Sequence, residues 1–341
     1  MGYDVTIGIP VYKSADYIRR ALESALAQTY SSIEYLVIDD AGYDGSLDII
    51  NAIAQAHPRG KDIRVICHQE NLGVSASRNQ IIDEAQGDYL YFMDSDDTIA
   101  ENTIELLMHN IRHFDAEIVF GSYEKIELSG VKTLYQYPSI QLLREGELAG
   151  FAYCKYASIQ ASSCNYLVKI DILRDNKLRF IDTSYWEDFV FTFDLVTYIS
   201  RAVLLPDVTY SYNCRPNSLS HYQHRNTISK HEVWQNVRAI DSLKISSSRL
   251  LNKAYFPNRC YNIVMTDFYI ACNILKRRND IVPYVRDWEI KSLMRHPASL
   301  LQVCKFRQSR AKNIIFLIVG KLPAFWCVRV IWCVGKLKKL I

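Results

Sequence analysis

The fold of this chain follows from the stretch Gly87-Asp88-Tyr89-Leu90-Tyr91-Phe92-Met93-Asp94-Ser95-Asp96-Asp97. Its apolar, β-rich run from Tyr89 to Met93 is typical of a buried strand, and three carboxylates follow within four positions. A buried strand cannot hold clustered unpaired charges, because each carboxylate would lose its hydration without compensation. We therefore expect residues 94–97 at the carboxyl end of a strand, facing a crevice.

Two interpretations of this acidic end are open. Carboxylate oxygens beside the phosphates of a substrate are the ligands that hard divalent cations such as Mg²⁺ or Mn²⁺ prefer. Alternatively, Asp96 or Asp97 caps a helix that begins near Asn102, because Asp is a strong N-cap residue. The other motifs of the chain help to decide between the metal site and the helix cap.

Strand and helix patterns alternate before this stretch. Residues 5–10, 33–38 and 63–67 have strand patterns, and helical patterns of about a dozen residues separate them. Such alternation indicates βαβ units and a parallel sheet, whose ligands bind beyond the carboxyl ends of the strands. The second strand also ends in two carboxylates, Asp39 and Asp40, so two acidic strand ends are expected in one crevice.

Several classes of protein are disfavoured. The first strand is not followed by G-x-G-x-x-G, which argues against a dinucleotide-binding domain, and a G-x-x-x-x-G-K-[ST] phosphate loop is missing. The nine cysteines are odd in number and lack C-x-x-C spacing, so the sequence indicates neither a disulfide framework nor a zinc site. Reduced thiols and an N-terminus without a basic leader predict a cytosolic protein.

Charge is distributed unevenly along the chain. The formal net charge of the 341 residues is +3, but residues 291–341 contain eleven Lys or Arg and lack Asp and Glu. Residues 1–290 carry 29 basic and 37 acidic side chains, a net charge of −8. From about Thr227 the pattern is helical to the end, with a break near Pro283. The sequence therefore predicts an acidic body and a basic, apolar tail.

The ordered set of motifs resembles family 2 glycosyltransferases. That resemblance implies an α/β chain of GT-A fold, with a Rossmann-like, mostly parallel nucleotide-binding sheet and a helical C-terminal extension. The GT-A domain would span residues 1–225, with a nucleotide-sugar half (1–100) and an acceptor half (101–225), and residues 226–341 would form the helical region. The motifs are Val5-Thr6-Ile7-Gly8-Ile9-Pro10-Val11-Tyr12, Asp39-Asp40, Asn71-Leu72-Gly73 with Ser77-Arg78-Asn79, Asp94-Ser95-Asp96-Asp97 and Trp186-Glu187-Asp188.

The resemblance implies a UDP-sugar as donor. A carboxylate at the end of the second strand would accept the imide N–H of uracil, and the end of the first strand would form an apolar wall beside the base. Asp94 would meet the ribose, and Asp96 would bind a Mn²⁺ or Mg²⁺ ion that offsets the charge of the leaving diphosphate. Arg78 would reach a phosphate or pair with the acidic loop. The implied nucleotide-sugar residues are Pro10, Val11, Tyr12, Asp39, Asp40, Arg78, Asp94 and Ser95, and the implied metal ligands are Asp96, Asp97 and His221.

The second half of the reaction is assigned to Trp186-Glu187-Asp188. An inverting transfer needs one base that takes a proton from the acceptor hydroxyl, and we expect Asp188 in this role, with Glu187 as the second choice. Trp186 and Asn165 would contact the acceptor, and Arg215 and Ser218 belong to a loop that would close over the donor phosphates. Alternatively, the two acidic residues only begin a helix, whose first turn favours negative charge.

The expected activity is an inverting, metal-dependent hexosyl transfer from a UDP-sugar to a glycan or lipid-linked acceptor, in the synthesis of a bacterial surface polysaccharide such as a capsule. The alternatives are a catalytically silent nucleotide- or glycan-binding protein and a nucleotidyltransferase. The tail at about 291–341 mixes aromatic and basic residues, which suits an anionic membrane better than nucleic acid. We expect a peripheral protein on the inner face of the cell membrane, unless the tail packs on the protein's own core.

Overall fold

The computed structural model describes residues 2–154, 159–183, 185–215 and 227–341. The chain divides into two compact units. The first consists of Met1–Leu148, Ala161–Asp182 and Phe191–Ser218, and the second of Ala149–Gln160, Thr183–Val190 and Leu219–Ile341. The division of the first unit into donor and acceptor halves stays a prediction.

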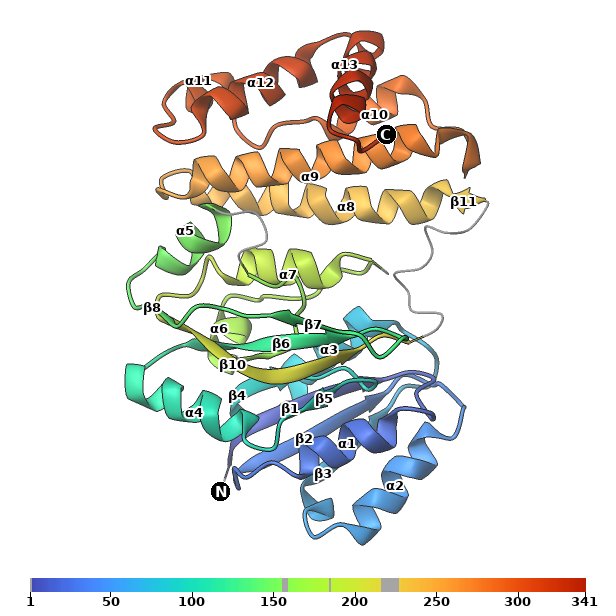
Figure 1. The fold of residues 1–341 in the computed structure, drawn as a ribbon, viewed down its shortest axis with the longest axis vertical. Coiled ribbons are helices and arrows are strands. Elements are labelled where there is room, and N and C mark those ends of the chain that lie inside the picture. The colour runs from blue at the N-terminus through green and yellow to red at the C-terminus, as the bar shows by residue number, and fades with distance from the viewer. Residues whose placement is uncertain (1, 155–158, 184, 216–226) are drawn as a thin grey trace. The chain divides into compact units, whose positions relative to one another are not determined.

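A ten-stranded mixed sheet forms the centre of the first unit (Figure 1). Its strand order is β3-β2-β1-β4-β9-β6-β10-β5, with β7 paired to β6 and β8 to β10. The strands β3, β2, β1 and β4 pair in parallel, as the alternation of strands and helices predicts. The bounds are β1 Tyr3–Val11, β2 Ile33–Asp39, β3 Ile63–Cys67, β4 Gly87–Phe92, β5 Thr98–Ile99, β6 Ile118–Ile126, β7 Lys132–Tyr135, β8 Ile140–Leu142, β9 Tyr166–Lys169 and β10 Ala202–Asn213.

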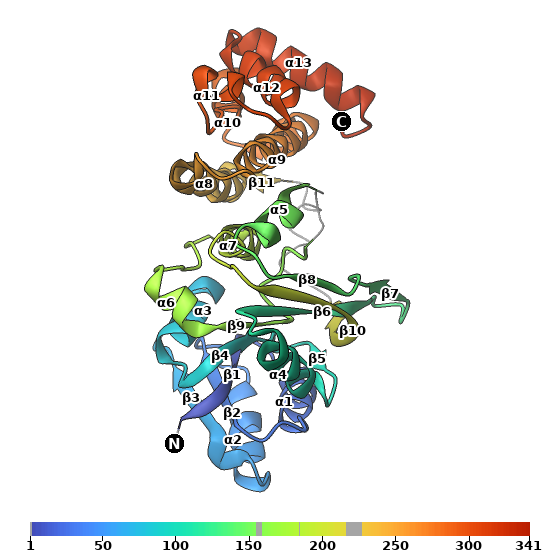
Figure 2. The ribbon, with the colours of Figure 1, turned by 90° about the vertical axis from the view of Figure 1, so that its left-hand side faces the viewer.

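Helices cover both faces of the parallel strands, with α1 on one face and α3 on the other (Figures 1 and 2). The apolar positions of α1, which recur every three or four residues, are the ones buried against the sheet. On the opposite face, α3 lies so close to β1 that a side chain at Gly8 would clash with Ile81. The bounds are α1 Ile18–Leu26, α2 Ser46–Ala56, α3 Val74–Glu84, α4 Thr103–Phe114, α5 Glu147–Cys154, α6 Ile170–Asp175 and α7 Glu187–Leu195.

Two strands differ from the sequence-based expectation. Residues 202–205 and 208–212 have separate strand patterns, but they form the single strand β10, which passes through Pro206 with shifts in register. Strand β9, with only four residues, carries too short a pattern to be predicted, yet it pairs antiparallel with both β4 and β6. It thereby joins the parallel strands to the rest of the sheet.

The second unit is mainly helical. Helix α9 lies between α8 on one side and α12 and α13 on the other (Figures 1 and 2). Among the described residues, no helix is both long enough and apolar enough to cross a bilayer. The bounds are β11 Ile228–Ser229, α8 Lys230–Ser246, α9 Phe256–Lys276, β12 Ile281–Val282, α10 Asp287–Leu293, α11 Leu300–Cys304, α12 Arg310–Lys321 and α13 Ala324–Leu337.

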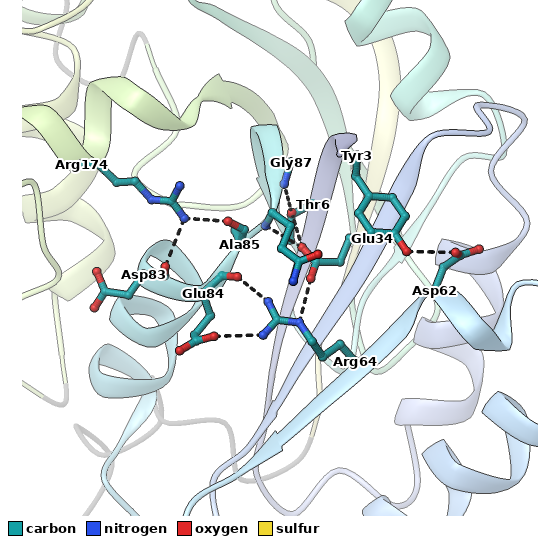
Figure 3. A network of polar contacts seen from close by, with 11 residues as sticks. Tyr3, Thr6, Glu34, Asp62, Arg64, Asp83, Glu84, Ala85, Gly87 and Arg174 are labelled. Carbon is teal, nitrogen blue, oxygen red and sulfur yellow. Dashed lines mark hydrogen bonds and ion pairs between the residues drawn. The ribbon is translucent and has the colours of Figure 1, made fainter. Parts of the chain in front are cut away.

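A buried carboxylate locks the amino ends of the parallel strands (Figure 3). Glu34 on β2 accepts hydrogen bonds from Thr6 Oγ1 on β1 at 2.6 Å, from the backbone N of Gln86 at 2.8 Å and from Arg64 Nε on β3 at 2.9 Å. Gly87 at the start of β4 donates its backbone N–H to the same Thr6 hydroxyl. One side chain therefore fixes the relative register of β1, β2, β3 and β4.

We predict that Glu34→Ala lowers the free energy of unfolding by about 3 kcal/mol, because it leaves buried donors without their acceptor. Glu84→Ala is the matched control: Glu84 contacts the same Arg64, but its side chain is 46% exposed, against 2% for Glu34. An exposed pair of this kind contributes less than about 1 kcal/mol. Urea unfolding of both variants checks the prediction, and equal losses would contradict it.

Candidate active site at the carboxyl edge of the sheet

The carboxyl ends of β1 and β2 meet at one edge of the sheet. The loops that follow them are joined by Asp44, whose carboxylate accepts the backbone N–H of Ala15 at 2.9 Å and the hydroxyl of Ser46 at 2.7 Å. Gly42 in the second loop is so close to Lys13 in the first that a Cβ would lie 2.7 Å from the Lys13 backbone nitrogen. The two loops therefore form one connected rim.

Asp40, which directly follows β2, is held within the protein. Its carboxylate accepts the backbone N–H groups of Leu72 at 2.8 Å and Gly73 at 2.9 Å, and it lies 2.6 Å from His68 Nδ1. The other ring nitrogen of His68 lies 2.5 Å from Gln80 Oε1 on α3. These contacts order the loop after β3, and they give both carboxylate oxygens of Asp40 a backbone donor. The contact of Asp40 with a nucleotide base stays a prediction.

Asp39 and Tyr12 lie at the same edge, at the end of β2 and directly after β1. Burial raises the pKa of Asp39, although a hydrogen bond from the Gly42 backbone opposes the shift. Tyr12 is exposed, whereas Pro10 and Val11 are buried within β1. Of the apolar wall predicted beside the base, only the Tyr12 side chain is therefore exposed, and the other two pack beneath the surface. The edge thus offers one carboxylate acceptor beside one aromatic ring.

The acidic loop, residues 94–97, follows β4, and its first carboxylate, Asp94, is paired with an arginine. Arg78 on α3 donates from a terminal guanidinium nitrogen to Asp94 Oδ1 at 2.9 Å. Its guanidinium lies 5.4 Å from the ring centroid of Phe180, and its side chain is 3% exposed. Arg78 is therefore not a loose surface partner: it fixes Asp94, and Asp94 itself remains partly open to solvent.

Asp97 ties the acidic loop to the end of β10. It accepts hydrogen bonds from Tyr210 Oη at 2.6 Å and from the backbone N–H of Asn213 at 2.7 Å. Burial raises the pKa of Asp97 to about 8, helped by the negative charges of Asp94 and Asp96 and opposed by these two donors. Because Asp97 is used in this way, it does not cap α4, whose N-cap residue is Asn102.

Asp96 lies between two arginines. Its carboxylate pairs with Arg215 Nε at 2.7 Å, and its backbone oxygen accepts a hydrogen bond from Arg20 on α1 at 3.0 Å. Burial, with the charge of Asp94, raises the pKa of Asp96 to about 6. The neighbouring Ser95 is bound to Ser14 through their hydroxyls at 2.7 Å, so Ser95 positions the loop.

The acidic loop has the chemistry of a divalent-cation site. One oxygen each from Asp94, Asp96 and Asp97 lies within 4.8 Å of the others. Hard oxygen donors that are close together, two of them with a raised pKa, suit Mg²⁺ or Mn²⁺. Asp94 and Asp96 are partly open, whereas both oxygens of the buried Asp97 already accept hydrogen bonds, so Asp97 orients the other two.

The placement of Asn165 speaks against the predicted acceptor contact. Its side chain is 2% exposed, and its amide donates to the backbone oxygens of Gly121 and Ser122 and accepts from Thr209 Oγ1 at 2.6 Å. These bonds join the residue just before β9 to β6 and β10. Asn165 therefore serves the fold of the first unit.

Trp186, Glu187 and Asp188 belong to the second unit. Helix α7 begins at Glu187, so both carboxylates lie in its first turn, partly exposed. Trp186 has a φ of 68°, a left-handed backbone that a bulky residue rarely adopts, and its ring packs edge-on against Phe189. Ser218 and His221 lie outside the described residues.

Two residues at the edge were missed by the sequence reasoning. His68 directly follows the third parallel strand, and a polar residue at a strand's carboxyl end is a signal that could have found it. Tyr210 donates to Asp97 and accepts the backbone N–H of Asp94 at 3.2 Å. It lies inside an apolar strand pattern, which gives no such signal.

Comparison with known proteins agrees with this geometry. Residues 6–171 match the family model for glycosyl transferase family 2. The chain is 37% identical over 120 residues to glycosyltransferase GlyG of Streptococcus pneumoniae, which is 35% of this chain and 38% of that protein. It is 28% identical over 223 residues to the succinoglycan biosynthesis protein ExoO of Rhizobium meliloti, which is 64% of this chain and 62% of that protein. The matches thus span less than two thirds of either relative.

Solved structures agree on the fold. The crystal structure of S. aureus TarS 1-349 in complex with UDP-GlcNAc aligns with 94% of this chain and 90% of that chain, with a TM-score of 0.61 and 19% identity. At that identity the likeness shows the fold alone. The parallel strands with their acidic carboxyl edge, the family match and the shared fold agree: residues 6–171 belong to glycosyl transferase family 2, and the chain has the GT-A fold.

Proposed function

We propose that the protein moves a sugar from a UDP-sugar to a hydroxyl group of a glycan acceptor, with inversion at the anomeric carbon, in the synthesis of a surface polysaccharide. The observation that carries the proposal is the convergence of Asp39, Asp94 and Asp96 at the carboxyl edge of the sheet. The relatives support it, since ExoO is described as a succinoglycan biosynthesis protein and TarS was solved with UDP-GlcNAc.

In this proposal, different residues of the sheet edge contact different parts of the UDP-sugar. Asp39 accepts the imide N–H of uracil, and Tyr12 covers the base. Asp94, oriented by Arg78, receives the ribose hydroxyls. Asp94 and Asp96 would hold a Mn²⁺ or Mg²⁺ ion, which when bound offsets the charge that develops on the leaving diphosphate.

The acceptor side supplies the base. Asp188 takes the proton of the acceptor hydroxyl while that oxygen attacks the anomeric carbon, and the bond from this carbon to the diphosphate oxygen breaks, releasing UDP. The left-handed backbone at Trp186 supports a functional role for this turn, because such strain persists only where the surroundings enforce it. The family match favours glycosyl transfer over nucleotidyl transfer.

The proposal predicts that metal and nucleotide stabilise the protein together. UDP at 100 times its Kd should add about 2.7 kcal/mol to the free energy of unfolding in the presence of Mn²⁺, and much less in a chelator. Differential scanning fluorimetry measures the shift in Tm, and Asp96→Ala should remove its metal-dependent part. Equal stabilisation by UDP with and without metal would refute the metal assignment.

The assignment of the base predicts a loss of turnover without a loss of donor binding. Asp188→Asn keeps the shape of the side chain and removes the proton acceptor, so UDP-sugar turnover should fall by roughly 10²–10⁴-fold while the Kd for UDP stays near that of the wild type. Glu187→Gln, one residue earlier in the same turn, is the matched control. If only the control loses activity, Glu187 is the base.

We also propose that the second unit binds the surface of an anionic membrane, where a lipid-linked acceptor would be confined. The helix pair α12 and α13 has two different faces. On the inner face Cys327, Val328 and Ile331 are buried, and at Gly335 a Cβ would lie 2.9 Å from Cys272 Sγ of α9. The alternative that the tail packs on the protein's own core is therefore correct for this face.

The outer face of α13 supports the membrane proposal. It exposes Phe325, Trp326 and Trp332 beside two cations, with Arg329 4.4 Å from the Phe325 ring and Lys336 4.1 Å from the Trp332 ring. Aromatic rings with basic neighbours, and no acidic residue from 291 onward, suit the headgroup layer of an anionic bilayer. We therefore propose that the protein is peripheral on the inner face of the cell membrane.

The membrane proposal predicts that the full-length protein sediments with vesicles rich in phosphatidylglycerol, that phosphatidylcholine vesicles bind it weakly, and that high salt releases it. Trp326→Ser should weaken binding about tenfold, because a buried aromatic side chain contributes at least about 1.5 kcal/mol. Ile245→Ser on α8, across α9 from α13, is the control, since Ile245 is exposed to a similar degree (69% against 55%). Equal binding by both variants would contradict the assignment of this face.

A further inference from the structure

Two arginines form ion pairs with carboxylates of the acidic loop, and they differ in how deeply their side chains are buried. Arg78 is 3% exposed, comes from the body of α3 and lies against Phe180. Arg215 is 30% exposed and comes from the chain just after β10. Its guanidinium pairs with Asp96 and lies 5.7 Å from the ring centroid of Tyr17. Arg78 is thus a fixed partner, whereas the side chain of Arg215 has room to move.

The backbone that carries Arg215 is anchored independently of this ion pair. Two residues earlier, Asn213 donates its backbone N–H to Asp97 at 2.7 Å, and Tyr210 on the same strand donates to the other oxygen of Asp97. The Arg215 side chain can therefore leave Asp96 while its backbone stays beside the acidic loop. A displaced guanidinium would remain within reach of a ligand bound at this edge.

Arg215 and a divalent cation would compete for the same carboxylate. The Nε of Arg215 lies 2.7 Å from Asp96 Oδ2, and Asp96 is one of the two partly open carboxylates of the loop. A metal ion bound to this oxygen would lie in contact with the guanidinium, and the two positive charges would repel each other. Metal binding at this oxygen of Asp96 therefore requires Arg215 to move.

We propose that Arg215 is an internal cation that occupies Asp96 until a divalent metal ion replaces it, and that the displaced guanidinium then pairs with the diphosphate of the nucleotide-sugar. The inference rests on the proposed function and adds a role for Arg215 in the order of binding. A guanidinium is suited to this exchange, because its planar set of donors pairs equally well with carboxylate and phosphate oxygens.

The exchange makes metal and nucleotide cooperative. Metal alone must displace Arg215 from Asp96 with no new anionic partner to receive it, so it binds weakly. When the nucleotide is also bound, its diphosphate supplies that partner. By thermodynamic linkage, the nucleotide raises the affinity for the metal by the same factor by which the metal raises the affinity for the nucleotide.

The test is Mn²⁺ binding to the full chain, measured by electron paramagnetic resonance with and without UDP. Arg215→Gln removes the competitor, so we expect it to bind Mn²⁺ alone about tenfold more tightly than the wild type, and to lose most of the strengthening of Mn²⁺ binding by UDP. Arg215→Lys keeps a cation beside Asp96 and should bind Mn²⁺ alone as weakly as the wild type.

Arg20→Gln is the matched control for charge. Arg20 contacts the backbone oxygen of Asp96 and not its carboxylate, so this variant removes one positive charge near the site without removing the competitor. If Arg215→Gln binds Mn²⁺ alone no more tightly than Arg20→Gln, or keeps the full strengthening by UDP, the inference is wrong. If the wild type binds no Mn²⁺ even with UDP, the proposed metal site itself fails.

Discussion

Negative charge at the end of a buried strand is the constraint on which the rest of the first unit depends. The side chains of residues 90–93, at the end of β4 and directly after it, are almost fully buried, and the chain then places three carboxylates in a small space. Each must find donors, and these come from separate elements: Arg78 from α3, Tyr210 from β10 and Arg215 from the chain after it. The acidic loop thereby holds together parts of the chain that are far apart in sequence, and it leaves Asp94 and Asp96 open to a ligand.

The opposite end of the same strands is closed in a complementary way. At the amino edge, Glu34 joins β1, β2 and β3, because its carboxylate accepts hydrogen bonds from three donors of the protein. The carboxyl edge, in contrast, keeps carboxylates that are partly open to solvent. In the second unit, Lys244 and Asp267 form a buried ion pair at 2.8 Å, and burial raises the pKa of Asp267 to about 7. The buried charges of Glu34 and Asp267 are thus paired inside their units, whereas α13 exposes basic and aromatic side chains and the sheet edge keeps two partly open carboxylates, Asp94 and Asp96.

Much of this could be predicted from the sequence, because the parallel strands and the helices between them have strong periodicity. Strands β1 to β4 were found within about two residues, and the acidic end of β4 was placed correctly. What the sequence could not indicate depends on tertiary contacts. Asp39 and Asp40 look alike in sequence, yet backbone donors from the loop after β3 occupy only Asp40. Asn165 resembles a surface residue until β9 is known to lie between β4 and β6. The two faces of α13 likewise appear only when its packing on α9 is known.

The central claim is that the carboxyl edge of the sheet binds a metal ion and a uridine nucleotide together. The most direct measurement is anomalous diffraction at the manganese absorption edge, from crystals of the protein grown with Mn²⁺ and UDP. The account predicts a strong peak within coordination distance of Asp94 or Asp96, with the uracil ring beside Asp39 and Tyr12. A manganese peak elsewhere in the protein, or UDP bound away from these residues, would contradict it.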